Sequence, residues 1–172
     1  MRVRRRHALC GLTAVLLLSA GLGPAGTNKI KRRSTMRFMM LMIPGGYEAA
    51  APGTMPSAEA VAAMMKYNTA LKEAGVLITL DGLHPPSSGA RVSFAGGKPV
   101  VTDGPFTESK EVLGGYWMID VKSREEAVGW AKRCPASPTD IIEIRQVHEM
   151  SEFPPEVQEA AAGFAELQGH NN

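Results

Sequence analysis

A run of charged side chains just before an apolar strand contains the residue types most suited to chemistry. The run, VTDGPFTESKEVLGG, holds three carboxylates, Asp103, Glu108 and Glu111, and one amine, Lys110. Asp-Gly-Pro is also ordinary turn chemistry, because Asp bonds nearby amides and Pro stiffens the exit. If a helical turn begins after Phe106, Glu108 and Glu111 share one face. The run is therefore either a structural loop or a set of polar groups directed into a pocket.

His84 is the second group with chemical potential, because it stands on a loop directly after an expected strand. Loops at strand ends are usual places for functional side chains. Imidazole titrates near neutral pH, so with Asp103 beside it His84 would be a general base oriented by a carboxylate. The alternative is a hydrogen-bonded surface histidine. Asp103 and His84 are the candidate catalytic residues.

Further polar side chains are candidates for binding a ligand. Arg91 or Arg145 can hold an anionic group, because a guanidinium pairs with carboxylates and phosphates. Asn68 is the one polar member of an apolar helix stripe, where it either ties down a loop backbone or recognises a ligand. The candidate binding residues are Lys110, Glu111, Glu108, Arg91, Asn68 and Arg145.

No sequence pattern points to a metal or a cofactor. The histidines and cysteines show no H-x-H, H-E-x-x-H or paired-cysteine spacing, so a catalytic zinc site is poorly supported. Neither a dinucleotide fingerprint nor a nucleophile elbow occurs. We therefore expect no metal and no cofactor. Cys134, which precedes Pro135, is expected to be a small buried apolar residue.

Charge is divided unevenly along the 172 residues. Of the 19 Lys and Arg, eight lie in residues 1–35, which contain no acid, so the rest of the chain holds 11 basic and 17 acidic side chains. An acidic domain gains nothing from releasing the counterions of a phosphate backbone. We therefore expect no direct binding of nucleic acid.

Residues 1–35 have two interpretations. A basic start, an apolar run and small residues give the layout of a secretory signal peptide, and the run is too short for a membrane span. Alternatively, AGG AGG codons for the two arginines of RRST would form a bacterial ribosome-binding sequence, and translation would start at Met36. We favour the second interpretation, which implies a cytoplasmic protein; the first implies an exported one.

From Met36 onward, periodicity predicts alternating strands and helices. Apolar runs and period-two alternation predict strands, ARVSFAGGKPVVT predicts a hairpin with Gly96-Gly97 as a two-residue turn, and Ser57 and Ser123 are expected helix caps. The first helix has an expected buried stripe of Val61, Met64, Met65, Asn68 and Leu71. The expected strands are 36–43, 76–82, 116–121 and 140–150, and a third amphipathic helix, with Val157, Ala160, Ala161, Phe164 and Leu167 on its apolar face, follows Pro154-Pro155.

The order β-α-β, hairpin, β-α-β predicts an α+β fold, a ferredoxin-like antiparallel sheet with two helices on one face. We expect a domain over residues 36–150 and a helical tail over residues 151–172. Two helices cover one face only. The other, with Tyr116, Met118 and Arg145, needs a cover, so we expect a homodimer through it.

The stretch VTDGPFTESKEVLGGYWMIDVKSREEAVGWAKRCP closely resembles the DGPF, or YCII-related, domain proteins, as do MLMIPGGYE, LDGLHPPSSGARVSF and IEIRQV. The resemblance implies a dimeric ferredoxin-like α/β-barrel fold and a cytoplasmic bacterial protein. YCII-like relatives bring a histidine and an aspartate together in a cleft. Asp103 matches that aspartate, but the first helix carries Asn68 and no histidine, which leaves His84 as the candidate.

Two functions follow. One is a domain that binds or acts on a small molecule in a pocket formed with Asp103, Lys110, Glu111 and His84 near the dimer interface. The other, which the resemblance implies, is a non-catalytic partner domain in transcription regulation, since members of the DGPF branch often accompany, or are fused to, extracytoplasmic-function sigma factors. Polar groups converging in a concave site favour the first. A solvated loop beside an apolar patch favours the second.

Overall fold

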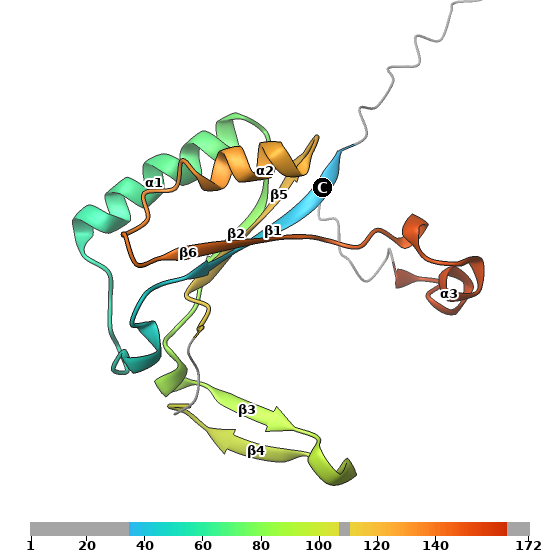
Figure 1. The fold of residues 1–172 in the computed structure, drawn as a ribbon, viewed down its shortest axis with the longest axis horizontal. Helices are drawn as coiled ribbons and strands as arrows, with labels where there is room; N and C mark the ends of the chain where they lie inside the picture. The colour runs from blue at the N-terminus through green and yellow to red at the C-terminus, as the bar shows by residue number, and fades with distance from the viewer. Residues whose placement is uncertain (1–34, 107–110, 165–172) are drawn as a thin grey trace, which may run out of the picture. The chain divides into compact units, whose positions relative to one another are not determined.

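A four-stranded antiparallel sheet with two helices on one side forms the body of the protein (Figure 1). The computed structural model describes residues 35–106 and 111–164, so the predictions for residues 1–34 lie outside the described part. Strand order is β2-β5-β1-β6, that of a ferredoxin-like fold. The strands are β1 (Met36–Ile43), β2 (Leu77–Gly82), β5 (Gly115–Val121) and β6 (Ile141–Gln146). The predicted α+β fold is confirmed, and the sheet stays open within one chain.

The helices α1 (Ala58–Glu73) and α2 (Arg124–Ala131) begin where the sequence predicts. The Ser57 hydroxyl accepts from the Ala60 amide at 3.1 Å, and the Ser123 hydroxyl accepts from the Glu126 amide at 3.2 Å. Each cap satisfies an amide that has no partner inside the helix. These caps fix where each helix starts over the sheet.

The core lies between the sheet and the two helices. Trp117 and Ile119 of β5 alternate with outward residues and face the helices, as predicted. The Tyr67 ring packs edge-on to Trp117 at 5.8 Å, and its hydroxyl donates to the Trp130 carbonyl at 3.1 Å. Burial raises the pKa of the Tyr67 hydroxyl well above its ordinary value. The buried core comprises Phe38, Met40, Met42, Tyr67, Leu71, Val76, Trp117, Ile119, Val121, Ala127 and Trp130.

The expected stripe of α1 is wrong at two positions. Val61 and Met65 are 44% and 56% exposed, whereas Tyr67, absent from the expected stripe, is buried together with Leu71. Both wrong positions belong to the first half of α1, ahead of the turn that meets α2. The fully buried residues of α1 therefore lie in its second half, and Met64 of the first half is partly buried against the core.

The strands β3 (Ala90–Ser93) and β4 (Val100–Asp103) form a hairpin that is a two-stranded sheet of its own. Ser93 pairs with Val100, so six residues separate the strands rather than the predicted two. Pro99 has no amide to donate and cannot extend the ladder. Gly96 and Gly97 both adopt positive φ, 71° and 76°, within this loop.

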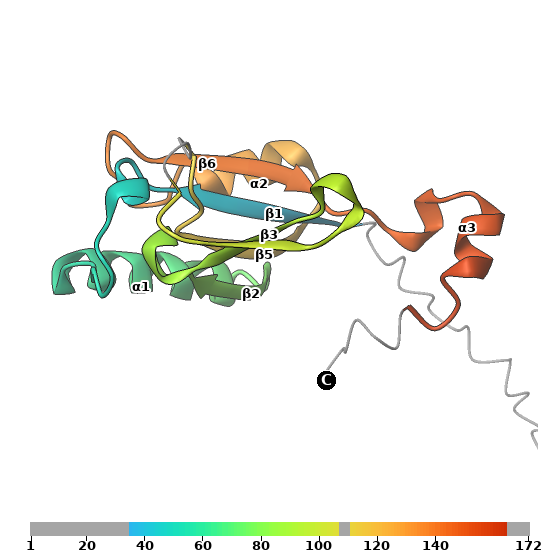
Figure 2. The same ribbon diagram turned by 90° about the horizontal axis from the view of Figure 1, so that it is seen from below.

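The segment after β6 is tied to β1 by an ion pair. The Arg37 guanidinium donates to both Glu149 carboxylate oxygens, at 2.7 and 3.1 Å, and this contact raises the pKa of Arg37. The last described helix, α3 (Pro155–Ala160), buries none of its residues, and Leu167 of its expected apolar face lies outside the described residues. Figure 2 shows α3 from a second side.

None of the helices in residues 35–106 and 111–164 is long and apolar enough to cross a membrane.

Candidate functional site

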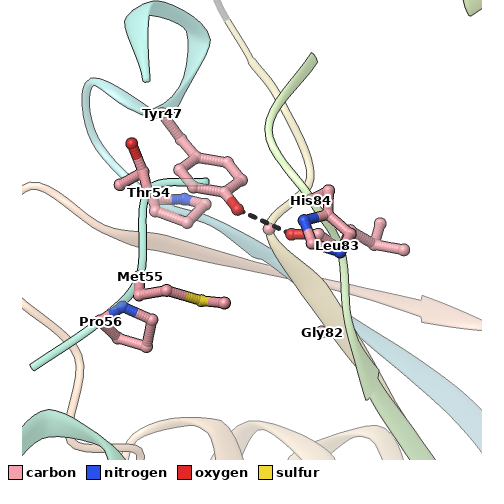
Figure 3. Close-up of a pocket in the computed structure, with 9 residues that line it drawn as sticks. Tyr47, Thr54, Met55, Pro56, Gly82, Leu83 and His84 are labelled. Carbon is pink, nitrogen blue, oxygen red and sulfur yellow. Dashed lines mark hydrogen bonds between the residues drawn. The ribbon is translucent and has the colours of Figure 1, made fainter. Parts of the chain in front are cut away.

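A cavity of about 610 Å³ lies where the ends of β1 and β2 meet the start of β5. We call it the histidine cavity. Figure 3 shows Tyr47 and Met55 on one side of it and Leu83 and His84 on the other. Its lining consists of Pro44, Tyr47, Thr54, Met55, Pro56, Gly82, Leu83, His84 and Gly114.

A chain of hydrogen bonds holds the walls of the histidine cavity together. The Tyr47 hydroxyl donates to the Leu83 carbonyl at 2.7 Å (Figure 3). The Leu83 amide in turn donates to the Gly114 carbonyl at 2.8 Å, and the Gly114 amide donates to the Met42 carbonyl at 2.9 Å. The bonds link the loop after β1, the end of β2 and the start of β5. This series of hydrogen bonds sets the position of His84, which follows Leu83 in the sequence.

Gly114 and Gly115 are required by close approaches to neighbouring atoms. A Cβ atom at Gly114 would lie 2.5 Å from Pro44 Cγ, and one at Gly115 would lie 2.7 Å from the Asp81 carbonyl oxygen. Real Cβ atoms essentially never approach other atoms closer than 3.0 Å. The two glycines therefore let the start of β5 pass directly against the cavity wall.

His84 is exposed, and its ring lines the cavity. Within the described part of the chain its ring makes no hydrogen bond, so both nitrogens remain for a ligand. The next two residues, Pro85 and Pro86, are buried and anchor the loop. An imidazole held in this way can donate to or accept from a bound polar group.

The Asp-Gly-Pro-Phe stretch fastens the hairpin to the turn over residues 86–89. The Gly104 amide donates to the Gly89 carbonyl at 2.8 Å, and a Cβ atom at Gly104 would collide with the Pro86 carbonyl oxygen. The guanidinium of Arg91 lies 4.0 Å from the centre of the half-buried Phe106 ring. Contacts of this kind are cation–π interactions. Gly and Phe of the stretch thus have structural roles.

Asp103, the last residue of β4, is exposed and does not line the histidine cavity. No hydrogen bond joins it to His84 among the described residues. Glu108 and Lys110 lie outside the described residues, and Glu111 is exposed. A joint role of Asp103 and His84 therefore stays a prediction.

The remaining candidates lie on separate elements. Arg145 is on β6, on the sheet face away from the helices, with Nε 3.8 Å from an oxygen of Glu143. Arg91 is on the hairpin. The Asn68 side-chain carbonyl accepts from Trp117 Nε1 at 2.8 Å, so Asn68 holds a core side chain rather than a loop backbone.

A second cavity of about 360 Å³ adjoins the first and shares Pro56, Gly82 and Gly114 with it. We call it the methionine cavity. It lies between α1 and the β2–β5 edge, and Val61 and Met65, which the core leaves exposed, belong to its wall. The lining is Met42, Pro56, Ala60, Val61, Met64, Met65, Asn68, Leu80, Asp81, Gly82, Gly114, Gly115, Tyr116 and Trp117.

Sequence reasoning missed the contribution of the loop between β1 and α1. Tyr47, Thr54 and Met55 line the histidine cavity, yet the sequence marks this stretch only as a loop. The one available signal is an aromatic residue directly after Pro44-Gly45-Gly46, where a turn would not need one.

Among the described residues, no three His, Cys, Asp or Glu side chains are grouped so as to hold a metal ion.

Comparison with known sequences identifies the family. Residues 36–151 match the sequence model of the YCII-related domain. The chain belongs to the YCII-related domain family. It is also 40% identical over 60 residues to the Uncharacterized protein R00369 of Rhizobium meliloti (strain 1021), an alignment covering 35% of this chain and 48% of that protein. This YCII-related chain thus spans about half the length of the curated relative it matches.

Proposed function

We propose that this YCII-related domain binds a small molecule in the histidine cavity. One observation carries the proposal: a cavity of about 610 Å³ is lined by mainly apolar walls, with the His84 ring and the Tyr47 hydroxyl among its few polar groups. Pockets of roughly 300–1,000 Å³ with a few placed polar groups are typical of small-molecule sites. His84 is the residue that would bond or exchange a proton with the ligand.

Catalysis by His84 together with Asp103 needs both side chains at one ligand. Since Asp103 does not line the histidine cavity, we restrict the proposal to binding at His84. The predicted partnership is tested separately by Asp103→Ala.

A thermal-shift screen of the full chain against a broad metabolite set tests the proposal. A ligand at a hundred times its dissociation constant stabilises the folded state by about 2.7 kcal/mol. We expect a hit that raises the Tm of the wild type and of His148→Ala, but not of His84→Ala. His148 is the matched control, because its ring is exposed and contacts Glu152 instead of the cavity. A hit that stabilises His84→Ala equally would contradict the proposal.

We further propose that two copies associate through the sheet face without helices. Strand register places Met39, Leu41, Tyr116 and Met118 together on this face. Arg37 and Asp120 lie at one end, and Glu143 and Arg145 lie along β6. Because the apolar centre is bordered by charges of both signs, the face can complement itself about a two-fold axis. Association would cover the apolar centre.

The hairpin favours a second candidate function, that of a non-catalytic partner domain. Four of its large apolar residues are exposed: Val92 (52%), Phe94 (73%), Val100 (51%) and Val101 (65%). Exposed apolar patches often mark protein interaction sites. From the resemblance to the DGPF branch, the partner would be an extracytoplasmic-function sigma factor.

Light scattering of the chain mixed with such a sigma factor from the same genome tests this candidate. A complex that Phe94→Asp abolishes would support it, while Leu113→Asp, at an exposed residue outside the hairpin, should leave the complex intact. Unchanged masses of the two separate proteins would contradict it.

A further inference from the structure

The methionine cavity owes its space to missing side chains at the end of the β2–β5 ladder. Leu80 pairs with Trp117, Asp81 with Tyr116, and Gly82 with Gly115. Side chains alternate across a sheet, so the Gly82–Gly115 pair faces the same side as the Leu80–Trp117 pair. That is the side that α1 covers, and two side chains are absent from it where the core would otherwise continue.

Most polar atoms at the methionine cavity already have partners within the protein. Trp117 Nε1 donates to Asn68, and the Tyr116 hydroxyl donates to an Asp81 carboxylate oxygen at 3.0 Å. This last bond raises the pKa of Tyr116. What remains for a ligand is the surface of Val61, Met64, Met65 and Leu80, and methionine side chains adapt to ligands of varied shape.

The charged residues around the two cavities restrict the class of ligand that these cavities can bind. Among the described residues that line the two cavities, none is Lys or Arg, and Asp81 is the acidic member. An anion would find no counter-charge in these walls, and the Asp81 carboxylate lies on the opposite face of the sheet, bonded to Tyr116. An uncharged molecule avoids the cost of an unpaired charge.

We infer that the methionine cavity takes the apolar part of an elongated, uncharged ligand whose polar end lies in the histidine cavity. The inference rests on the proposed function for the placement of the polar end. The shared residues Pro56, Gly82 and Gly114 make the two cavities neighbours, so one ligand can reach from the His84 ring to the methionines. An alcohol with a linear alkyl chain has this chemistry.

Gly82 offers a way to fill the cavity without breaking the fold. A Cβ atom there would meet only the Gly114 carbonyl oxygen, at 4.0 Å, and would stand on the side of the sheet that α1 covers. Gly82→Leu should therefore occupy the space at the wall that both cavities share. Gly129→Leu on α2, where a Cβ atom meets nothing within 4 Å, is the matched control.

The experiment measures displacement of the uncharged fluorophore N-phenyl-1-naphthylamine from the full chain by 1-alkanols of increasing length. In the wild type and Gly129→Leu, each added methylene should tighten binding by a factor of about three to four until the cavity is full. In Gly82→Leu the affinity should stop rising with chain length. The anionic 8-anilinonaphthalene-1-sulfonate should bind at least tenfold more weakly than the uncharged fluorophore.

Three results would overturn the inference: no saturable binding of the fluorophore, chain-length dependence in Gly82→Leu equal to that of the wild type, or preference for the anionic dye. His84→Ala separates this inference from the proposed function. This substitution should weaken the binding of all alkanols by the same factor and leave the dependence of affinity on chain length intact. If binding to the wild type does not depend on chain length while His84→Ala still weakens it, the inference fails and the proposed function stands. If the chain-length dependence is present while His84→Ala has no effect, only the placement of the polar end at His84 fails.

Discussion

At the scale of single residues, Gly104 explains why the Asp-Gly-Pro-Phe stretch needs its glycine. A Cβ atom there would collide with the Pro86 carbonyl oxygen and would lie 2.8 Å from the carbonyl carbon of the same residue. Both atoms belong to the backbone, so relief requires the hairpin to move away from the turn. Overpacking of this kind costs about 1–3 kcal/mol.

Gly104→Ala is therefore expected to lower the free energy of unfolding by about 1–3 kcal/mol. Urea denaturation followed by tryptophan fluorescence measures it. Gly89→Ala is the control, because its Cβ atom would meet the nearest atom at an ordinary 3.6 Å, and it should change stability by less than about 0.5 kcal/mol. Equal stability of Gly104→Ala and the wild type would show that the hairpin is not held against residues 86–89.

Cys134 is a half-buried thiol, and burial raises its pKa to about 11 from an ordinary value of 9.0. The thiolate is the reactive form, so Cys134 should react slowly at neutral pH in the folded protein. Labelling with a thiol reagent in a Cys10→Ser background should accelerate strongly in denaturant. Equal rates with and without denaturant would contradict the protected position.

The same shift predicts a pH dependence of stability. Between pH 9 and 11 the unfolded thiol loses its proton while the folded thiol keeps it, so the contribution of Cys134 is full below pH 9 and is lost as pH approaches 11. Stability should fall less steeply over this window in Cys134→Ala than in the wild type, as measured by urea denaturation at each pH. Parallel curves for the two proteins would contradict the shift.

At the scale of elements, the bond between Asn68 and Trp117 joins α1 to β5 at the edge of the methionine cavity. Asn68→Ala leaves the buried Trp117 Nε1 without a partner, which costs about 1–3 kcal/mol of stability. Thr69→Ala on the exposed side of α1 should cost less than about 0.5 kcal/mol. Urea denaturation measures both. A double-mutant cycle with Trp117→Phe should show coupling, and additivity of the two changes would rule the bond out as a stabilising contact.

At the scale of the whole molecule, the uncovered sheet face predicts the assembly state. Light scattering should give twice the mass of one chain, because the proposed pairing would bury the apolar centre around Met118 between two copies. Met118→Arg should yield single chains, and Gly129→Arg, on the exposed side of α2, should leave the pair intact. A wild-type mass of one chain at micromolar concentration would refute the pairing.

The fold could be predicted from the sequence because its signals are periodic and local. Alternation in Tyr116–Val121 and the caps at Ser57 and Ser123 specify strands and helices directly. Pairing order follows from the rules of β-α-β connections. The wrong predictions concern contacts that the sequence pattern does not encode. The apolar stripe of α1 does not distinguish core positions from cavity positions, and Pro99 shortens the hairpin ladder.

The candidate site was predictable only in part. His84 was found because it follows a strand end, and it does line a cavity. Tyr47 and Met55 come from a loop with no periodic pattern, and only the folded chain brings them opposite His84 (Figure 3). The expected meeting of His84 with Asp103 depended on how the hairpin is oriented, which spacing along the chain does not encode.

The most direct test of ligand binding beside His84 is histidine-ring NMR on the full chain with the hit of the thermal-shift screen. The chain has four histidines, and His→Ala variants assign their ring signals. Binding in the histidine cavity predicts that saturating ligand shifts the His84 ring signals and leaves those of His148 unchanged. Unchanged His84 signals at saturation would contradict the account.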